Sequence, residues 1–130
     1  MSQFLTPYRA ELLEERREGR LLWRMLEPLV YESEVAACRI TVPAGFIHDG
    51  ESIGLRLRSF TGFECLRAGA VHDWLYTVRS IDIHQIERDL ADLVYEEACQ
   101  VDGTPGLDPV DARKKYNAVS FYGKSNWGIP

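Results

Sequence analysis

A glycine-rich segment at residues 43–54 separates two stretches of the chain that have different hydrophobic patterns. It holds three glycines and one proline in twelve residues, a composition that disfavours regular structure. Short runs typical of strands precede it, and longer runs typical of helices follow it. We therefore predict an α+β fold: an N-terminal antiparallel β-sheet, a glycine-rich loop and a C-terminal three-helix unit.

Three strands are predicted before the loop, at residues 21–26, 29–33 and 38–42, and Pro43 ends the last of them. Residues 9–17 are ambiguous. Their leucines and glutamates suit a helix, but their place just before a glycine suits the first arm of a hairpin. We favour the hairpin.

Three helices are predicted after the loop, at residues 65–78, 82 to about 101, and 109 to about 123. Asp82 is the expected N-cap of the second helix, and Pro109 stands at the favoured first position of the third. No linker or repeat interrupts the pattern, so residues 1–130 are expected to form a single domain.

Composition excludes several functional classes. The net charge of −5 argues against non-specific nucleic-acid binding. No apolar run approaches the roughly 20 residues of a membrane span, and the N-terminus does not read as a signal peptide. Three widely spaced cysteines form no disulfide framework and no zinc motif. We expect reduced thiols, in a host cytoplasm or in a virion.

The dipeptide His72-Asp73 is the strongest candidate for chemistry, since it lies in an apolar helix. A buried imidazole needs a partner for its N–H, and a mid-helix Asp must be solvated, paired or bound to a metal. The plainer alternatives are a core histidine bonded to a carbonyl, and an Asp73 salt bridge with Arg67 or Arg79.

The second helix supplies possible partners for the histidine. If it packs antiparallel to the first helix, Asp92, or failing that Asp89, could bond the His72 ring, fix its tautomer and strengthen it as a general base. A second His-Asp pair, His48-Asp49, lies in the glycine loop, where Asp followed by Gly is also a common turn.

An ordered set of motifs resembles an uncharacterised family of small proteins from tailed phages and prophages, a domain of unknown function. The matching segments are VPAGF with a following DG and SI in 42–53, AVHD-x-LY in 70–76, AD at 91–92, Y-x-AV in 116–119, Gly123 and Trp127. His48, Glu51 and Gly54 depart from the family pattern within the loop.

The resemblance implies a virion-associated component, at the tail or baseplate, whose partners are other phage structural proteins or further copies of the chain. The apolar tail 127–130 is expected to dock, and we favour a neighbouring subunit over its own domain as the partner.

A local resemblance leads to a different function. His-Asp-x-x-Tyr on one helix, with an Asp on the next antiparallel helix, is similar to the core of phospholipase A2. It implies a hydrolase in which His72 activates water and Asp92 orients His72. Asp73 and Asp49 are then the expected Ca²⁺ ligands, and backbone oxygens of the 43–54 loop complete the shell. The cysteine framework of secreted phospholipases is absent.

Overall fold

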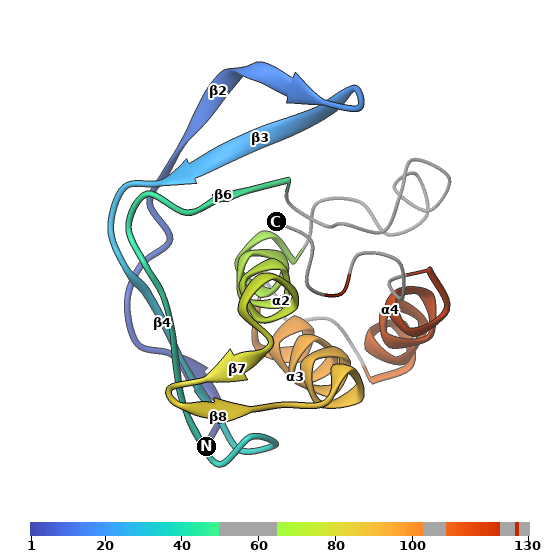
Figure 1. Ribbon diagram of the computed structural model, residues 1–130. Helices are drawn as coiled ribbons and strands as arrows, with labels where there is room; N and C mark the ends of the chain where they lie inside the picture. The colour runs from blue at the N-terminus through green and yellow to red at the C-terminus, as the bar shows by residue number, and fades with distance from the viewer. Residues whose placement is uncertain (50–64, 103–108, 123–126, 128–130) are drawn as a thin grey trace.

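The computed structural model describes residues 1–49, 65–102, 109–122 and 127. It has antiparallel sheets at the N-terminus and three helices at the C-terminus, which confirms the predicted α+β arrangement (Figure 1). The predicted N-terminal sheet is divided into two three-stranded sheets. Residues 50–54 of the predicted loop lie outside the described residues.

Helices α2 (Leu66–Val78) and α3 (Arg88–Val101) pack against the first sheet. Its strands are β1 (Gln3–Phe4), β4 (Leu29–Ser33) and β5 (Cys38–Val42), in the order β1-β4-β5. Burial alternates along β4, as expected for a sheet covered on one face. The buried Tyr31 hydroxyl donates to a carboxylate oxygen of Glu97 at 2.8 Å, which ties this sheet to the second helix.

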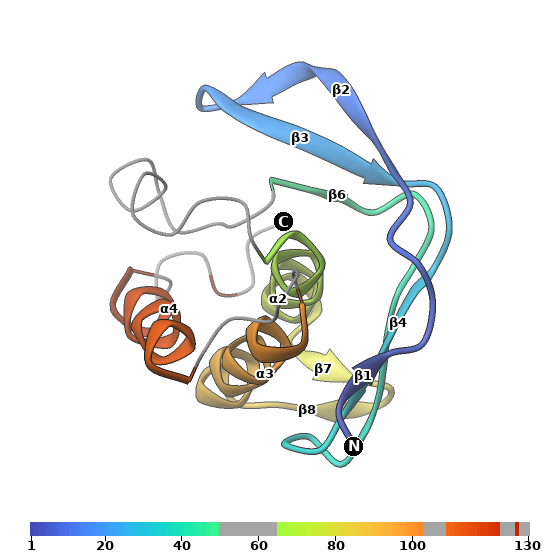
Figure 2. The ribbon, with the colours of Figure 1, turned by 180° about the vertical axis from the view of Figure 1, so that it is seen from behind.

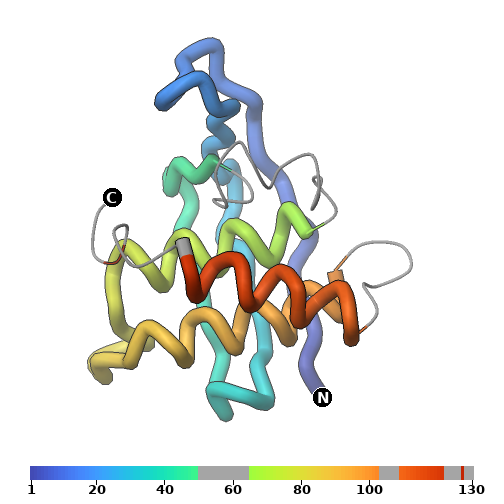
Figure 3. Tube along the Cα trace, turned by 90° about the vertical axis from the view of Figure 1, so that its right-hand side faces the viewer, coloured from blue at the N-terminus to red at the C-terminus, as the bar shows by residue number. Residues whose placement is uncertain are grey.

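The second sheet forms an arm. It consists of β2 (Ala10–Arg17), β3 (Arg20–Met25) and the short β6 (Ile47–His48), in the order β2-β3-β6. The hairpin formed by β2 and β3 projects away from the helices (Figures 1 and 3). Our preference for a hairpin over a helix at residues 9–17 is therefore confirmed.

A β-bulge interrupts the arm, because the pairing register of β2 with β3 shifts between Leu12 and Arg16. The Arg16 guanidinium folds back over this bulge. Its Nη1 donates to the carbonyl oxygens of Leu13, Glu14 and Glu15 at 2.9, 3.0 and 3.1 Å. Carbonyls on the bulged strand thus gain a partner from the same strand.

The helices are α2 (Leu66–Val78), α3 (Arg88–Val101) and α4 (Pro109–Tyr122). Helix α2 lies nearest the sheets, α3 packs against it, and α4 packs on α3 (Figure 2). Three consecutive small residues of α2, Ala68 to Ala70, are buried.

The predicted start of the second helix is wrong. Residues 80–85 form a hairpin of β7 (Ser80–Ile81) and β8 (His84–Gln85), and α3 begins only at Arg88. Asp82 has φ +55° in the hairpin turn, whereas an N-cap residue needs an extended backbone. Glu87, with φ −81° and ψ 151°, takes that place. Burial of Ile81 in the core accounts for the strand.

Leu75 provides a test of the helix packing, because it is fully buried in the core. We expect Leu75→Ala to lower the free energy of unfolding by about 2–5 kcal/mol, measured by urea denaturation. Leu26→Ala is the matched control. Leu26 is 55% exposed, and its truncation should change stability by only about 0.5 kcal/mol. Equal losses in the two variants would contradict this packing.

Candidate functional site

Asp92 is buried on α3, with 1% of its surface exposed, and its Oδ1 atom binds two side chains of α2. His72 Nε2 lies 2.9 Å from Oδ1, and the Tyr76 hydroxyl donates to the same oxygen at 2.6 Å. The expected contact between His72 and a carboxylate is therefore present, and it is made by Asp92. Asp89 is exposed and accepts a hydrogen bond from the Tyr116 hydroxyl.

The other oxygen of Asp92 faces α4 and the start of α3. Ser120 Oγ donates to Asp92 Oδ2 at 3.2 Å, and Arg88 Nη1 forms an ion pair with it at 3.6 Å. Arg88 Nη1 also donates to the Ser120 carbonyl oxygen at 3.1 Å. Sequence reasoning missed both residues. Arg88 could have been predicted, because residues four apart on one helix can form an ion pair. No sequence pattern near Ser120 predicts its contact with Asp92.

The His72 ring is 3% exposed and lies between two tyrosines. Its centroid is 4.2 Å from that of Tyr76 and 4.7 Å from that of Tyr95. An ionised carboxylate can only accept hydrogen bonds, so in the neutral ring Nε2 carries the proton and Nδ1 keeps a lone pair. Among the described residues the ring forms one hydrogen bond, through Nε2.

Tyr76 stays protonated while its hydroxyl donates to Asp92. Burial, followed by the hydrogen bond to Asp92, raises the pKa of Tyr76 well above its usual range. The hydroxyl therefore stays a donor. Trp127 packs edge-on against this ring, with centroids 5.0 Å apart. The preference for a neighbouring subunit as the partner of the tail is thus wrong for Trp127, which docks on its own chain; residues 128–130 lie outside the described residues.

Asp49 and Asp73, the expected metal ligands, are neighbours. The Asp49 backbone N–H donates to Asp73 Oδ2 at 3.3 Å, and Arg20 Nη1 lies 3.0 Å from Asp49 Oδ2. Arg67, one alternative partner of Asp73, instead pairs with Asp102 at 2.7 Å.

The described residues do not fit a calcium shell. The Asp49 carboxylate is neutralised by a guanidinium, whereas Ca²⁺ needs six to eight oxygen ligands. Within the described ranges, no group of three His, Cys, Asp or Glu side chains could hold a metal ion.

His48 lies at the base of the arm in an aromatic environment. It is 1% exposed, stacks with Trp23 and Phe46, and its Nε2 is 2.8 Å from the Tyr8 hydroxyl. Burial lowers the pKa of His48 to about 4, and the opposing effect of Asp49 is smaller. The ring is therefore neutral at pH 7 and can accept the Tyr8 proton at Nε2.

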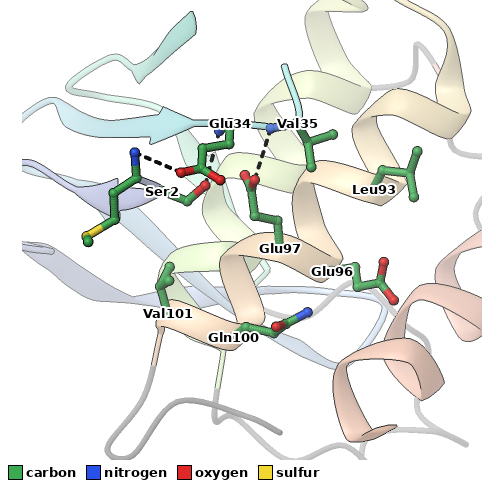
Figure 4. Close-up of a pocket in the computed structure, with 9 residues that line it drawn as sticks. Ser2, Glu34, Val35, Leu93, Glu96, Glu97, Gln100 and Val101 are labelled. Atoms are coloured by element: carbon green, nitrogen blue, oxygen red, sulfur yellow. Dashed lines mark hydrogen bonds and ion pairs between the residues drawn. The ribbon is translucent and has the colours of Figure 1, made fainter. Parts of the chain in front are cut away.

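A cavity of about 420 Å³ lies elsewhere, between α3, the first two residues of the chain and the turn at Glu34 and Val35 (Figure 4). Its carboxylates are engaged. Glu34 pairs with the N-terminal amine at 2.8 Å, Glu96 pairs with Arg113 at 2.6 Å, and Glu97 accepts the Val35 N–H at 3.0 Å. Neither His72 nor Asp92 lines this cavity.

A family described as "Protein of unknown function (DUF1353)" matches residues 23–119, which is most of the chain. The chain belongs to this family. No curated protein and no solved structure matches it. Among the described residues, no helix has the length and apolarity needed to cross a membrane.

The lowered pKa of His48 predicts a pH dependence of stability. In the unfolded chain a histidine takes up a proton near pH 6.5, whereas in the folded protein His48 does so only near pH 4. Its contribution to stability is therefore complete above pH 6.5 and is lost as the pH falls toward 4, by up to about 3 kcal/mol. Urea denaturation at several pH values measures this loss.

His48→Gln is the reference for that experiment, because other groups also titrate in this range. Stability of the variant should fall less than that of the wild type between pH 7 and pH 4. Parallel curves for the two proteins would show that His48 takes up its proton equally well in the folded state.

Proposed function

We propose that this member of the DUF1353 family is a hydrolase in which His72 is the general base and Asp92 orients it. The observation that carries the proposal is the state of the two ring nitrogens. Nε2 is bound to a buried carboxylate, and Nδ1 has a lone pair but no hydrogen-bond partner among the described residues. A purely structural histidine in a core usually has both nitrogens satisfied.

The Asp92 carboxylate performs two tasks in this scheme. It selects the tautomer that leaves Nδ1 able to accept a proton, and it stabilises the imidazolium that forms when Nδ1 has accepted one. The donors around Asp92 hold its position. Two of them are the Tyr76 and Ser120 hydroxyls, at 2.6 and 3.2 Å.

The reaction that suits this site is the hydrolysis of an ester by water. Nδ1 removes a proton from a water molecule, and the water oxygen forms a bond to the acyl carbon. When the tetrahedral intermediate collapses, the bond to the alkoxide breaks and the imidazolium returns the proton to it. The products are an acid and an alcohol. The His72 side chain is only 4% exposed, so a small nucleophile such as water suits the site better than a bulky one.

The resemblance to the phospholipase A2 helix supports the choice of an ester. His72 binds the Asp92 carboxylate of the next helix, as that resemblance implies, and Tyr76 of the same motif binds the same oxygen. No step is assigned to calcium, since Asp49 is paired with Arg20.

Ester hydrolysis tests the proposal directly. With a short-chain chromogenic ester and phospholipid micelles as substrates, we expect His72→Gln and Asp92→Asn to lower kcat/KM by about 100-fold or more. His84→Gln, at an exposed histidine of β8, is the control and should retain full activity. Thermal melting confirms that His72→Gln is folded. A wild type no more active than a folded His72→Gln on both substrates would refute the proposal.

A role in an assembly, at a phage tail or baseplate, is the second candidate. The observation that favours it is the projecting arm, which presents an exposed leucine, Leu12, with 56% of its surface accessible. Such an arm can reach a neighbouring subunit, either a further copy of this chain or another structural protein. An enzyme carried on a virion would satisfy both proposals.

Sedimentation tests self-association through the arm. We expect the wild type to form oligomers in a concentration-dependent way, and Leu12→Glu to remove them by placing a charge in the contact. Ile83→Glu is the control, at a side chain that is 90% exposed in the other hairpin. A monomeric wild type at all concentrations, or equal effects of the two variants, would exclude self-association through Leu12.

A further inference from the structure

Ser120 of helix α4 contacts the His72–Asp92 pair through its hydroxyl. The two oxygens of Asp92 are divided between elements: Oδ1 binds α2, and Oδ2 accepts the Ser120 hydroxyl at 3.2 Å. Figure 3 shows α4 running alongside α3, the helix that carries Asp92. A carboxylate bound at one oxygen can still rotate about its Cβ–Cγ bond, whereas donors at both oxygens hold its plane.

Arg88 fixes Ser120 in turn. Its Nη1 donates to the Ser120 carbonyl oxygen at 3.1 Å and lies 3.6 Å from Asp92 Oδ2. One guanidinium thus joins the last turn of α4 to the carboxylate. The Arg88 side chain is 29% exposed and that of Asp92 is 1% exposed, so the ion pair runs from the surface to a buried anion.

We infer that Ser120 and Arg88 are positioning residues: together they set the orientation of the Asp92 carboxylate and, through it, the tautomer of His72. This inference rests on the proposed function for its effect on catalysis, but its structural part stands without it. Ser120 lies one residue beyond the matched range 23–119, so the family match does not include it.

Ser120→Ala isolates the hydroxyl. The change removes the donor to Asp92 Oδ2 and keeps the backbone carbonyl that binds Arg88. Ser120→Thr restores a hydroxyl on the same carbon. Asn117→Ala, at an exposed position of the same helix, controls for a polar-to-alanine change on α4.

The first readout is the His72 ring itself, observed by ¹⁵N NMR at neutral pH. In the wild type, Ser120→Thr and Asn117→Ala, we expect the tautomer with the proton on Nε2 and a ring N–H protected from exchange with water. In Ser120→Ala and in Arg88→Gln, exchange should be about 5-fold faster, the factor that corresponds to one ordinary hydrogen bond. Unchanged exchange in both variants would overturn the inference, whether or not the protein is an enzyme.

The second readout is ester hydrolysis. We expect Ser120→Ala to lower kcat by about 5-fold without a change in KM, because the substrate does not touch Ser120, and we expect Ser120→Thr to recover the loss. A loss that appears in KM, or one that Asn117→Ala shares, would refute a positioning role. If the wild type hydrolyses no ester while the NMR result holds, the proposed function fails and the positioning of His72 by α4 stands.

Discussion

The burial of one carboxylate, that of Asp92, is the constraint on which the helical half of the molecule depends. An ionised carboxylate without partners in a protein interior costs several kcal/mol, and here the partners come from three helices. The charge is tolerable only when α2, α3 and α4 are all in place. A contact that joins all three helices is thus the same contact that organises His72, so the fold and the proposed chemistry share one interaction.

Much of this arrangement could be predicted from the sequence. Alternation and turn residues identified three strands and the hairpin, and the motif at 70–76 identified the histidine. The sequence favours Asp92 over Asp89 as the partner of His72, and Asp92 is indeed buried on α3. Leu90 and Leu93 of the same helix are half-buried, while Asp92 and Tyr95 are fully buried. A helix packed between two others buries two faces, and a single stripe does not describe it.

The errors have a common physical origin, because in each a tertiary contact outweighed a local preference. Asp82 is a good N-cap by type, but burial of Ile81 draws residues 80–85 into a hairpin. Trp127 lies on its own chain because the Tyr76 ring is available nearby. The hydrogen bond from Ser120 to Asp92 joins residues 28 positions apart in the sequence, and no pattern within either helix predicts it. A further contact that no local pattern indicates is the ion pair between the Asp49 carboxylate and Arg20 of the distant β3.

The guanidinium of Arg16 has a consequence for how the arm behaves in a crowded solution. A long strand at the border of a sheet normally offers a row of free carbonyls and amides, the template on which chains stack into fibrils. Over the bulge, three successive carbonyls are already occupied by Arg16 from the same strand. A strand that docked on these carbonyls would have to compete with a charged group. The projecting hairpin thus carries at its bulge a guanidinium that makes further strand pairing there less favourable.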